Sequence, residues 1–148
     1  MTNNLLPALA EFRYQIRRFL NFSKRAANAS GLEAQQHQML LVIASTPPGQ
    51  VSHVGRLAQR LFLHHNTAVE LVNRLERRRL ARRVASPDDR RRVGVVITPR
   101  GNALLARLTR HHLAELRTAG PQLIRALQAV LAGTKQRPAL RHTRRRPR

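Results

Sequence analysis

The chain has 148 residues, of which 42% are hydrophobic and 3% aromatic, enough for one domain whose core consists of aliphatic side chains. The 28 Lys and Arg against 7 Asp and Glu give a formal net charge of +21, which favours a polyanion as partner, either nucleic acid or an anionic membrane surface. The absence of cysteine excludes disulfides and Cys-ligated zinc, and we find neither an apolar run of the ~20 residues that a membrane span needs nor a signal peptide, so we expect a cytoplasmic protein with no membrane partner.

The first predicted element is a long amphipathic helix over residues 5–27. Its apolar residues follow spacings of four, three, four and three, which is the periodicity of one helix face. They are Leu5, Leu9, Phe12, Ile16 and Phe19. Such a stripe at the N-terminus needs a cover, either from another helix of this chain or from a second chain. A second helix is expected over residues 33–45, before a Pro-Pro-Gly break.

Two short helices joined by a tight turn are predicted next. We expect Ser52 to be the N-cap of a helix that ends at Leu61. After a short break at residues 62–65, a further helical run has apolar residues on one side and mainly polar residues on the other. This arrangement is typical of a helix-turn-helix.

Beyond this motif, the period changes from helical to alternating. Residues 80–84 and 93–98 read as two strands, and the charged, turn-rich segment 86–92 joins them into a β-hairpin with a basic tip. Another helix follows the hairpin. We expect Gly120-Pro121 to break it and a final helix to begin at Pro121 and end near Gly133. The segment 134–148 is basic and poor in apolar residues, and we expect it to be disordered.

The residues at the junctions of these elements resemble the family of multiple-antibiotic-resistance regulators (MarR). The resemblance covers about residues 5–132 and rests on four motifs, which are specific only in combination. They are Leu57-Ala58, Leu71-Val72-Asn73-Arg74-Leu75-Glu76, the pair Asp89 and Arg91, and Ile97-Thr98-Pro99-Arg100-Gly101. One departure is Arg79, which stands where the family usually has a glycine that allows a left-handed helix cap. The turn there is expected to be strained or to end differently.

The resemblance implies a mainly α fold with a small β-hairpin wing, a winged helix-turn-helix that dimerises through its N- and C-terminal helices. It implies an N-terminal dimerisation helix within residues 1–31, a DNA-binding domain over 32–100, C-terminal dimerisation helices over 101–133 and a basic tail over 134–148. The residues expected at the dimer interface are Leu5, Leu9, Phe12, Ile16, Phe19, Leu123, Leu127 and Leu131.

The function implied by the resemblance is sequence-specific binding of double-stranded DNA, as a homodimer on an inverted repeat, by a transcriptional regulator that acts as a repressor. The residues expected to contact DNA are His65, Asn66, Thr67, Asn73, Arg74, Asp89, Arg90, Arg91 and Arg92. Arg91 would reach into the minor groove, with Asp89 holding the hairpin or the arginine in place. A small-molecule effector that weakens DNA binding is typical of the family, and the sequence leaves open whether this chain keeps such a pocket. The alternative is a basic protein that binds or compacts nucleic acid without sequence preference.

No enzyme, cofactor or metal site is expected. We find no nucleophile beside a base, no paired acids and no glycine-rich phosphate loop. His111, His112 and Glu115 lie close in sequence, and Glu33 and His37 are spaced for one helix face. Adjacent histidines point in different directions on a helix, and no dense ligand motif exists, so these residues are expected to be polar rim residues.

Overall fold

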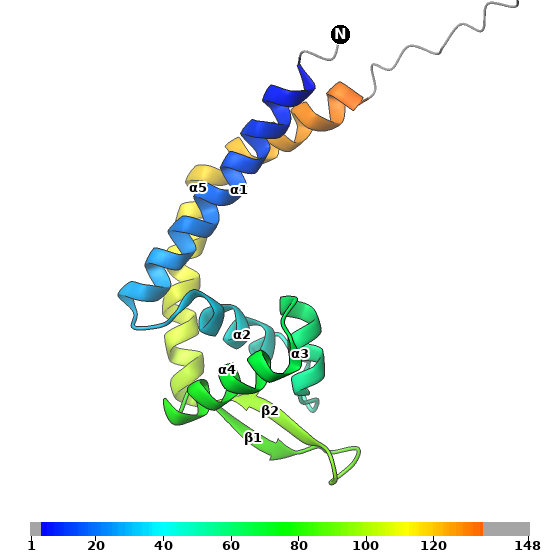
Figure 1. Cartoon of the computed structure of the whole chain (residues 1–148). Coiled ribbons are helices and arrows are strands. Elements are labelled where there is room, and N and C mark those ends of the chain that lie inside the picture. The colour runs from blue at the N-terminus through cyan, green and yellow to red at the C-terminus, as the bar shows by residue number, and fades with distance from the viewer. Residues whose placement is uncertain (1–3, 135–148) are drawn as a thin grey trace, which may run out of the picture. The chain divides into compact units, whose positions relative to one another are not determined.

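The computed structural model describes residues 4–134 and contains five helices and one two-stranded antiparallel sheet in that range (Figure 1). The elements are α1 (Leu5–Ala29), α2 (Ala34–Ala44), α3 (Val54–Leu61), α4 (His65–Arg77), β1 (Ala81–Ala85), β2 (Val93–Ile97) and α5 (Pro99–Thr134). They form two compact units. The central unit comprises residues 21–115, and the terminal unit comprises residues 4–20 and 116–134. This division cuts α1 and α5, whereas the expected domains have boundaries near the ends of helices.

The core of the central unit is aliphatic, as the scarcity of aromatic residues predicts. Its largest fully buried side chains include Leu40 from α2, Leu57 from α3, Leu75 from α4 and Leu108 from α5. Burial of each such leucine stabilises the fold by roughly 1.5–3 kcal/mol relative to exposure. Helices α2, α3 and α4 pack on one another, and the β1–β2 hairpin projects from them (Figure 1). The expected helix-turn-helix and wing are thus present, with helix and strand ends shifted by a few residues.

The expectation that Ser52 caps α3 is wrong. The N-cap of α3 is His53, which makes no side-chain cap hydrogen bond. Ser52 instead lies in an isolated β-bridge with Val95, whose backbone N–H donates to the Ser52 carbonyl at 2.7 Å. The Ser52 hydroxyl is hydrogen-bonded to that of Thr46. The extended backbone before α3 therefore adds to the hairpin, and the serine hydroxyl bonds to Thr46 and not to the first turn of the helix.

The backbone at the end of α4 shows how the chain accommodates Arg79 in place of a glycine. The Leu80 N–H donates to the Leu75 carbonyl and the Arg79 N–H to the Glu76 carbonyl, both at 2.9 Å. This is a Schellman cap, which requires a left-handed residue, and Arg79 adopts a φ of +57°. The strained alternative is therefore correct, since a left-handed conformation costs a non-glycine residue about 1–2 kcal/mol.

The terminal unit pairs the first part of α1 with the last part of α5. Arg18 donates to the Gln122 side chain at 2.8 Å across the pair. The expected break at Gly120-Pro121 is wrong, because α5 is one helix with Pro121 inside it. Proline normally disfavours helical backbone in the residue before it by a clash with that residue's Cβ. Here the preceding residue is Gly120, which has no Cβ, so this clash is absent.

The same helix extends through Gly133 to Thr134, which is part of α5 although disorder was expected from that residue onward. The rest of the expected disordered tail lies outside the described residues. Across residues 4–134, none of the helices has both the length and the apolar character needed to span a bilayer.

Candidate nucleic-acid interface

Helix α4 presents its first turn to solvent. Ala68, Leu71, Val72 and Leu75 are buried and fix the helix on the core. His65, Asn66 and Thr67 are all exposed, and the N-cap residue His64 makes no side-chain cap hydrogen bond. Three of the residues expected to contact DNA therefore lie together at one accessible helix end, where a phosphate or base edge can reach them.

Asn73 is held by the hairpin. Its side-chain oxygen accepts a hydrogen bond from the Arg83 guanidinium at 2.8 Å. Arg83 also donates to the Glu76 carboxylate, and the Arg83 backbone N–H donates to the same carboxylate at 3.3 Å. Glu76 and Asn73 of α4 therefore fix β1 against the helix, and one lone pair and the amide hydrogens of Asn73 are left for DNA.

Arg74 belongs to a cluster of ion pairs that includes Glu70 on α4 and Glu33 at the start of α2. Its guanidinium lies 3.3 Å from Glu33 and 3.3 Å from Glu70, and Arg77 lies 3.3 Å from the same Glu70. Hydrogen bonds from Arg74 and then Arg77 lower the pKa of the exposed Glu70 carboxyl. The two arginines therefore offset a negative charge that would repel phosphate. Arg77 is an exposed basic residue on the polar side of α4 that was not among the residues expected to contact DNA.

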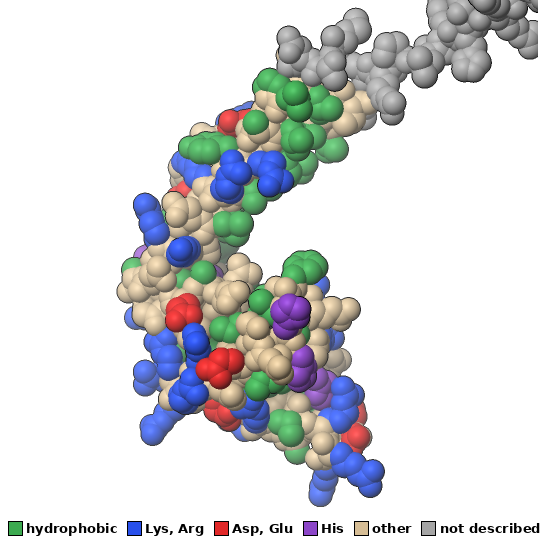
Figure 2. All heavy atoms as spheres, viewed as in Figure 1, with side chains coloured by type: hydrophobic (Ala, Val, Ile, Leu, Met, Phe, Trp, Pro, Cys, Tyr) green, Lys and Arg blue, Asp and Glu red, His purple; other side chains and the backbone are tan. Residues whose placement is uncertain are grey.

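The hairpin tip has five charged residues in an ordered turn, Asp88, Asp89, Arg90, Arg91 and Arg92. The Asp89 carboxylate accepts a hydrogen bond from the Arg91 backbone N–H at 2.9 Å, and the Arg92 N–H donates to the Asp89 carbonyl at 3.0 Å. Asp89 thus holds the backbone of the tip, while the side chains of Arg90, Arg91 and Arg92 are exposed. Figure 2 shows basic side chains gathered at the end of the hairpin. This geometry suits contacts with phosphates or a narrow groove.

The motif at the start of α5 joins the hairpin to the helix. The Thr98 hydroxyl accepts from the Gly101 N–H at 3.0 Å and donates to the Arg79 carbonyl at 2.7 Å. A Cβ on Gly101 would lie 2.1 Å from the Leu80 carbonyl oxygen, so only glycine fits there. The motif therefore fixes the position of the wing and does not itself form a binding or catalytic site.

The expectation that the histidines considered as metal ligands are polar rim residues is wrong for His37 and His112, which are buried and half-buried, whereas His111 is exposed. His112 is half-buried, with Nδ1 2.7 Å from the Leu108 carbonyl and Nε2 2.8 Å from the Ser23 hydroxyl. His37 is buried, and its ring centroid lies 4.9 Å from that of His112. Glu33 forms a capping box with Gln36 at the start of α2. Within residues 4–134, no three His, Cys, Asp or Glu residues come together as a metal site would require.

The residues expected at a dimer interface lie in the terminal unit and are incompletely covered. Leu5, Phe12, Ile16, Phe19 and Leu123 are half-buried, whereas Leu9, Leu127 and Leu131 are exposed. Leu6, Leu20 and Ile124 are also exposed. The pairing of α1 with α5 therefore leaves much of the apolar surface open (Figure 2).

Comparison with known proteins agrees with this architecture. A family profile described as the MarR family matches residues 30–92. A curated protein of Thauera aromatica, a candidate transcriptional regulatory protein for the hcr operon, is 31% identical over 84% of this chain and 74% of its own length.

Two solved structures have the same fold. A mutant of Staphylococcus aureus MepR bound to an oligodeoxyribonucleotide has a TM-score of 0.62 at 19% identity, covering 84% of this chain and 95% of that one. CouR of Rhodococcus jostii bound to p-coumaroyl-CoA has a TM-score of 0.60 at 24% identity, covering 76% and 83%. The curated relative and MepR are described as transcription regulators and not as enzymes, in agreement with the sequence analysis. The winged helix-turn-helix, the family profile and the curated relative together show that the chain belongs to the MarR family of transcription regulators.

Proposed function

We propose that this MarR-family regulator is a repressor that binds a specific double-stranded DNA sequence, with α4 in the major groove and the hairpin at the minor groove. The observation that carries the proposal is the exposure of His65, Asn66 and Thr67 on α4 together with the arginines of the ordered hairpin tip. MepR, a relative in fold, has been solved with an oligodeoxyribonucleotide. We further propose that the protein acts in the cytoplasm, where the DNA of a bacterial cell lies.

We also propose that the protein binds DNA as a homodimer joined through the terminal units. Exposed leucines on both helices of this unit, among them Leu9 and Leu131, support this assembly because contiguous apolar surface of this kind usually marks an interface. A two-fold dimer would place one α4 in each half of an inverted repeat, with half-site centres about 10 bp apart.

A small-molecule effector is the third part of the proposal. CouR, whose fold the chain shares, holds p-coumaroyl-CoA. The central unit contains a cavity of about 450 Å³ between α1 and α5, a size within the range of ligand sites. Occupation of such a cavity would release DNA if it disfavoured the DNA-bound arrangement of α4 and the hairpin.

The rival function is sequence-independent compaction of nucleic acid, which the charge of +21 favours. Selection from a random DNA pool, followed by competition binding, separates the two functions. A regulator should prefer the selected duplex over random DNA by at least about 10³-fold, whereas a compactor would bind both equally.

Arg91→Ala tests the wing. The substitution should weaken binding to the selected duplex by about 1–3 kcal/mol and leave the preferred sequence unchanged, because the lost contact is charge-assisted but not base-specific. Arg110→Ala is the matched control, since this arginine is exposed on α5 in the same unit. Equal losses for both variants would indicate binding through overall charge and not through the wing.

A further inference from the structure

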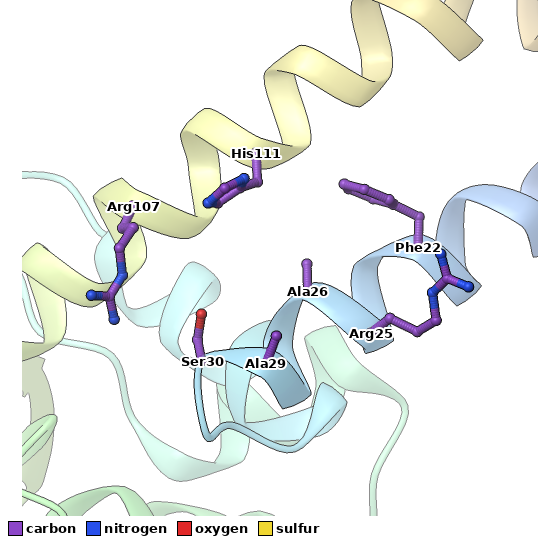
Figure 3. A pocket seen from close by; sticks show the side chains of 7 residues that line it. All are labelled: Phe22, Arg25, Ala26, Ala29, Ser30, Arg107 and His111. Atoms are coloured by element: carbon purple, nitrogen blue, oxygen red, sulfur yellow. The ribbon is translucent and has the colours of Figure 1, made fainter.

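Two neighbouring cavities open along α5 in the central unit. The first, of about 450 Å³, is lined by Phe22, Arg25, Ala26, Ala29, Ser30, Arg107 and His111. Figure 3 shows the Phe22 and His111 rings on opposite helices, facing the space between α1 and α5. The second, of about 260 Å³, is lined by Ser30, Arg78, Leu80, Arg100, Ala103, Leu104 and Arg107. Because they share Ser30 and Arg107, the two cavities adjoin and can hold one elongated molecule.

The charges around these cavities have one sign. Four arginines and no acid are among the described lining residues. The side chains of Arg25, Arg100 and Arg107 make no hydrogen bond or ion pair with any residue from 4 to 134, in contrast to Arg74 and Arg83, whose charges are matched by acids. Arg107 lines both cavities, Arg25 lines the first and Arg100 the second, so each cavity has unmatched positive charge. Guanidinium groups bind phosphates through two parallel hydrogen bonds.

The two cavities differ in their apolar content. The first has an aromatic ring and two alanine methyl groups on α1, a surface that suits an aryl or acyl group. The second has three arginines, which suit a group with more than one negative charge. From this division we propose that the two cavities form one effector site for a molecule with an apolar group at one end and at least two phosphates at the other.

Arg78 links this site to the recognition helix, and this consequence rests on the DNA-binding function proposed above. Arg78 is the C-cap of α4, and its guanidinium donates to the Gly31 carbonyl and, at 3.4 Å, to the Gln36 side chain. A phosphate in the second cavity would compete with these acceptors for the guanidinium. The end of α4 would then lose its tie to α2, and the ligand would weaken DNA binding.

The test is calorimetric titration of the full chain without DNA. Benzoyl-CoA and geranyl diphosphate each combine an apolar group with a diphosphate, and we call them the whole probes. Benzoate, coenzyme A and inorganic pyrophosphate are the half probes. At least one whole probe should bind about 10-fold or more tightly than any half probe, because both cavities then contribute. Binding of the half probes as tightly as the whole ones would overturn the proposal, as would no binding at all.

Two substitutions test which cavity binds each end of the ligand. Arg100→Ala should weaken the phosphate-bearing probes about 10-fold or more, with Arg110→Ala as the control for general charge. Phe22→Leu should weaken the whole probes and leave coenzyme A and pyrophosphate unaffected. Equal losses in Arg100→Ala and Arg110→Ala would overturn the site. A DNA-binding assay without ligand keeps the two proposals distinguishable: Arg100→Ala should bind DNA normally, and a loss as large as that of Arg91→Ala would assign Arg100 to the DNA interface instead.

Discussion

The side-chain oxygen of Asn73 accepts a hydrogen bond from the Arg83 guanidinium at 2.8 Å, which ties α4 to the first strand of the hairpin. The contact gives Asn73 a structural task besides the base contact expected from its residue type. We therefore expect Arg83→Ala to lower the free energy of unfolding by about 1 kcal/mol, because it removes hydrogen bonds to Asn73 and Glu76 that are only partly exposed. Urea unfolding measures this change.

Arg82→Ala is the control for that substitution, since Arg82 is its exposed neighbour on β1 and should cost little. On DNA, Arg83→Ala should weaken binding to all sequences alike by loosening the hairpin. Asn73→Ala should do the same if Asn73 acts only through Arg83. Relaxed preference at a single base pair would show instead that Asn73 reads a base edge.

Gly101→Ala should lower the free energy of unfolding by about 1–3 kcal/mol, since its Cβ would overlap the Leu80 carbonyl oxygen and push the hairpin from α5. Gly55→Ala is the matched control. A Cβ at Gly55 meets nothing within 4 Å, so alanine there should raise stability by up to about 1 kcal/mol through helix propensity. Equal effects of the two substitutions would contradict the close contact at Gly101.

Arg79→Gly should raise the free energy of unfolding by about 0.5–1 kcal/mol. Relief of the left-handed strain contributes about 1–2 kcal/mol, and the greater freedom of glycine in the unfolded chain offsets part of it. Arg79→Ala keeps the strain and removes the side chain, so no gain is expected from it. A similar gain from alanine would point to charge and not to backbone strain.

His37 should make stability depend on pH. Burial, followed by repulsion from His112, lowers its pKa below the ordinary value of about 6.5. As the pH falls through about 6.5, the unfolded chain takes up a proton at this residue before the folded chain does. The free energy of unfolding is therefore expected to decrease on acidification until the folded pKa is reached. Urea unfolding at pH 7.5 and 5.5 should show a smaller decrease in His37→Gln than in the original chain, with exposed His111→Gln as the control.

Leu9→Glu combined with Leu131→Glu should separate the proposed dimer into folded monomers. Both leucines are exposed in the isolated chain, so the charges should cost the fold little while opposing association. Analytical ultracentrifugation measures the mass, and circular dichroism checks that the helices remain. A variant that sediments as the original chain does would place the interface elsewhere.

The sequence was sufficient to predict the fold class and the order of the elements as far as the start of α5, because their signals are local. The helical spacing from Leu5 to Phe19, the polar side of α4 and the switch to alternation after Arg79 each depend on residues close in the chain. The family motifs were readable for the same reason. For Arg79 the sequence left two alternatives, a strained turn or a different helix end, and the structure has the strained turn.

Contacts between distant residues decided the rest. Ser52 has the residue type of a helix cap, but pairing with Val95 outweighs that local preference. Pro121 has the residue type of a helix break, yet α5 continues through it, and Gly120 before it has no Cβ to clash with the proline ring. Asn73 and Arg74 have the residue types of base readers, whereas the acids and arginines that engage them lie up to 41 residues away in sequence. A side chain's residue type sets what it can bond, and only the tertiary structure brings its partners within reach.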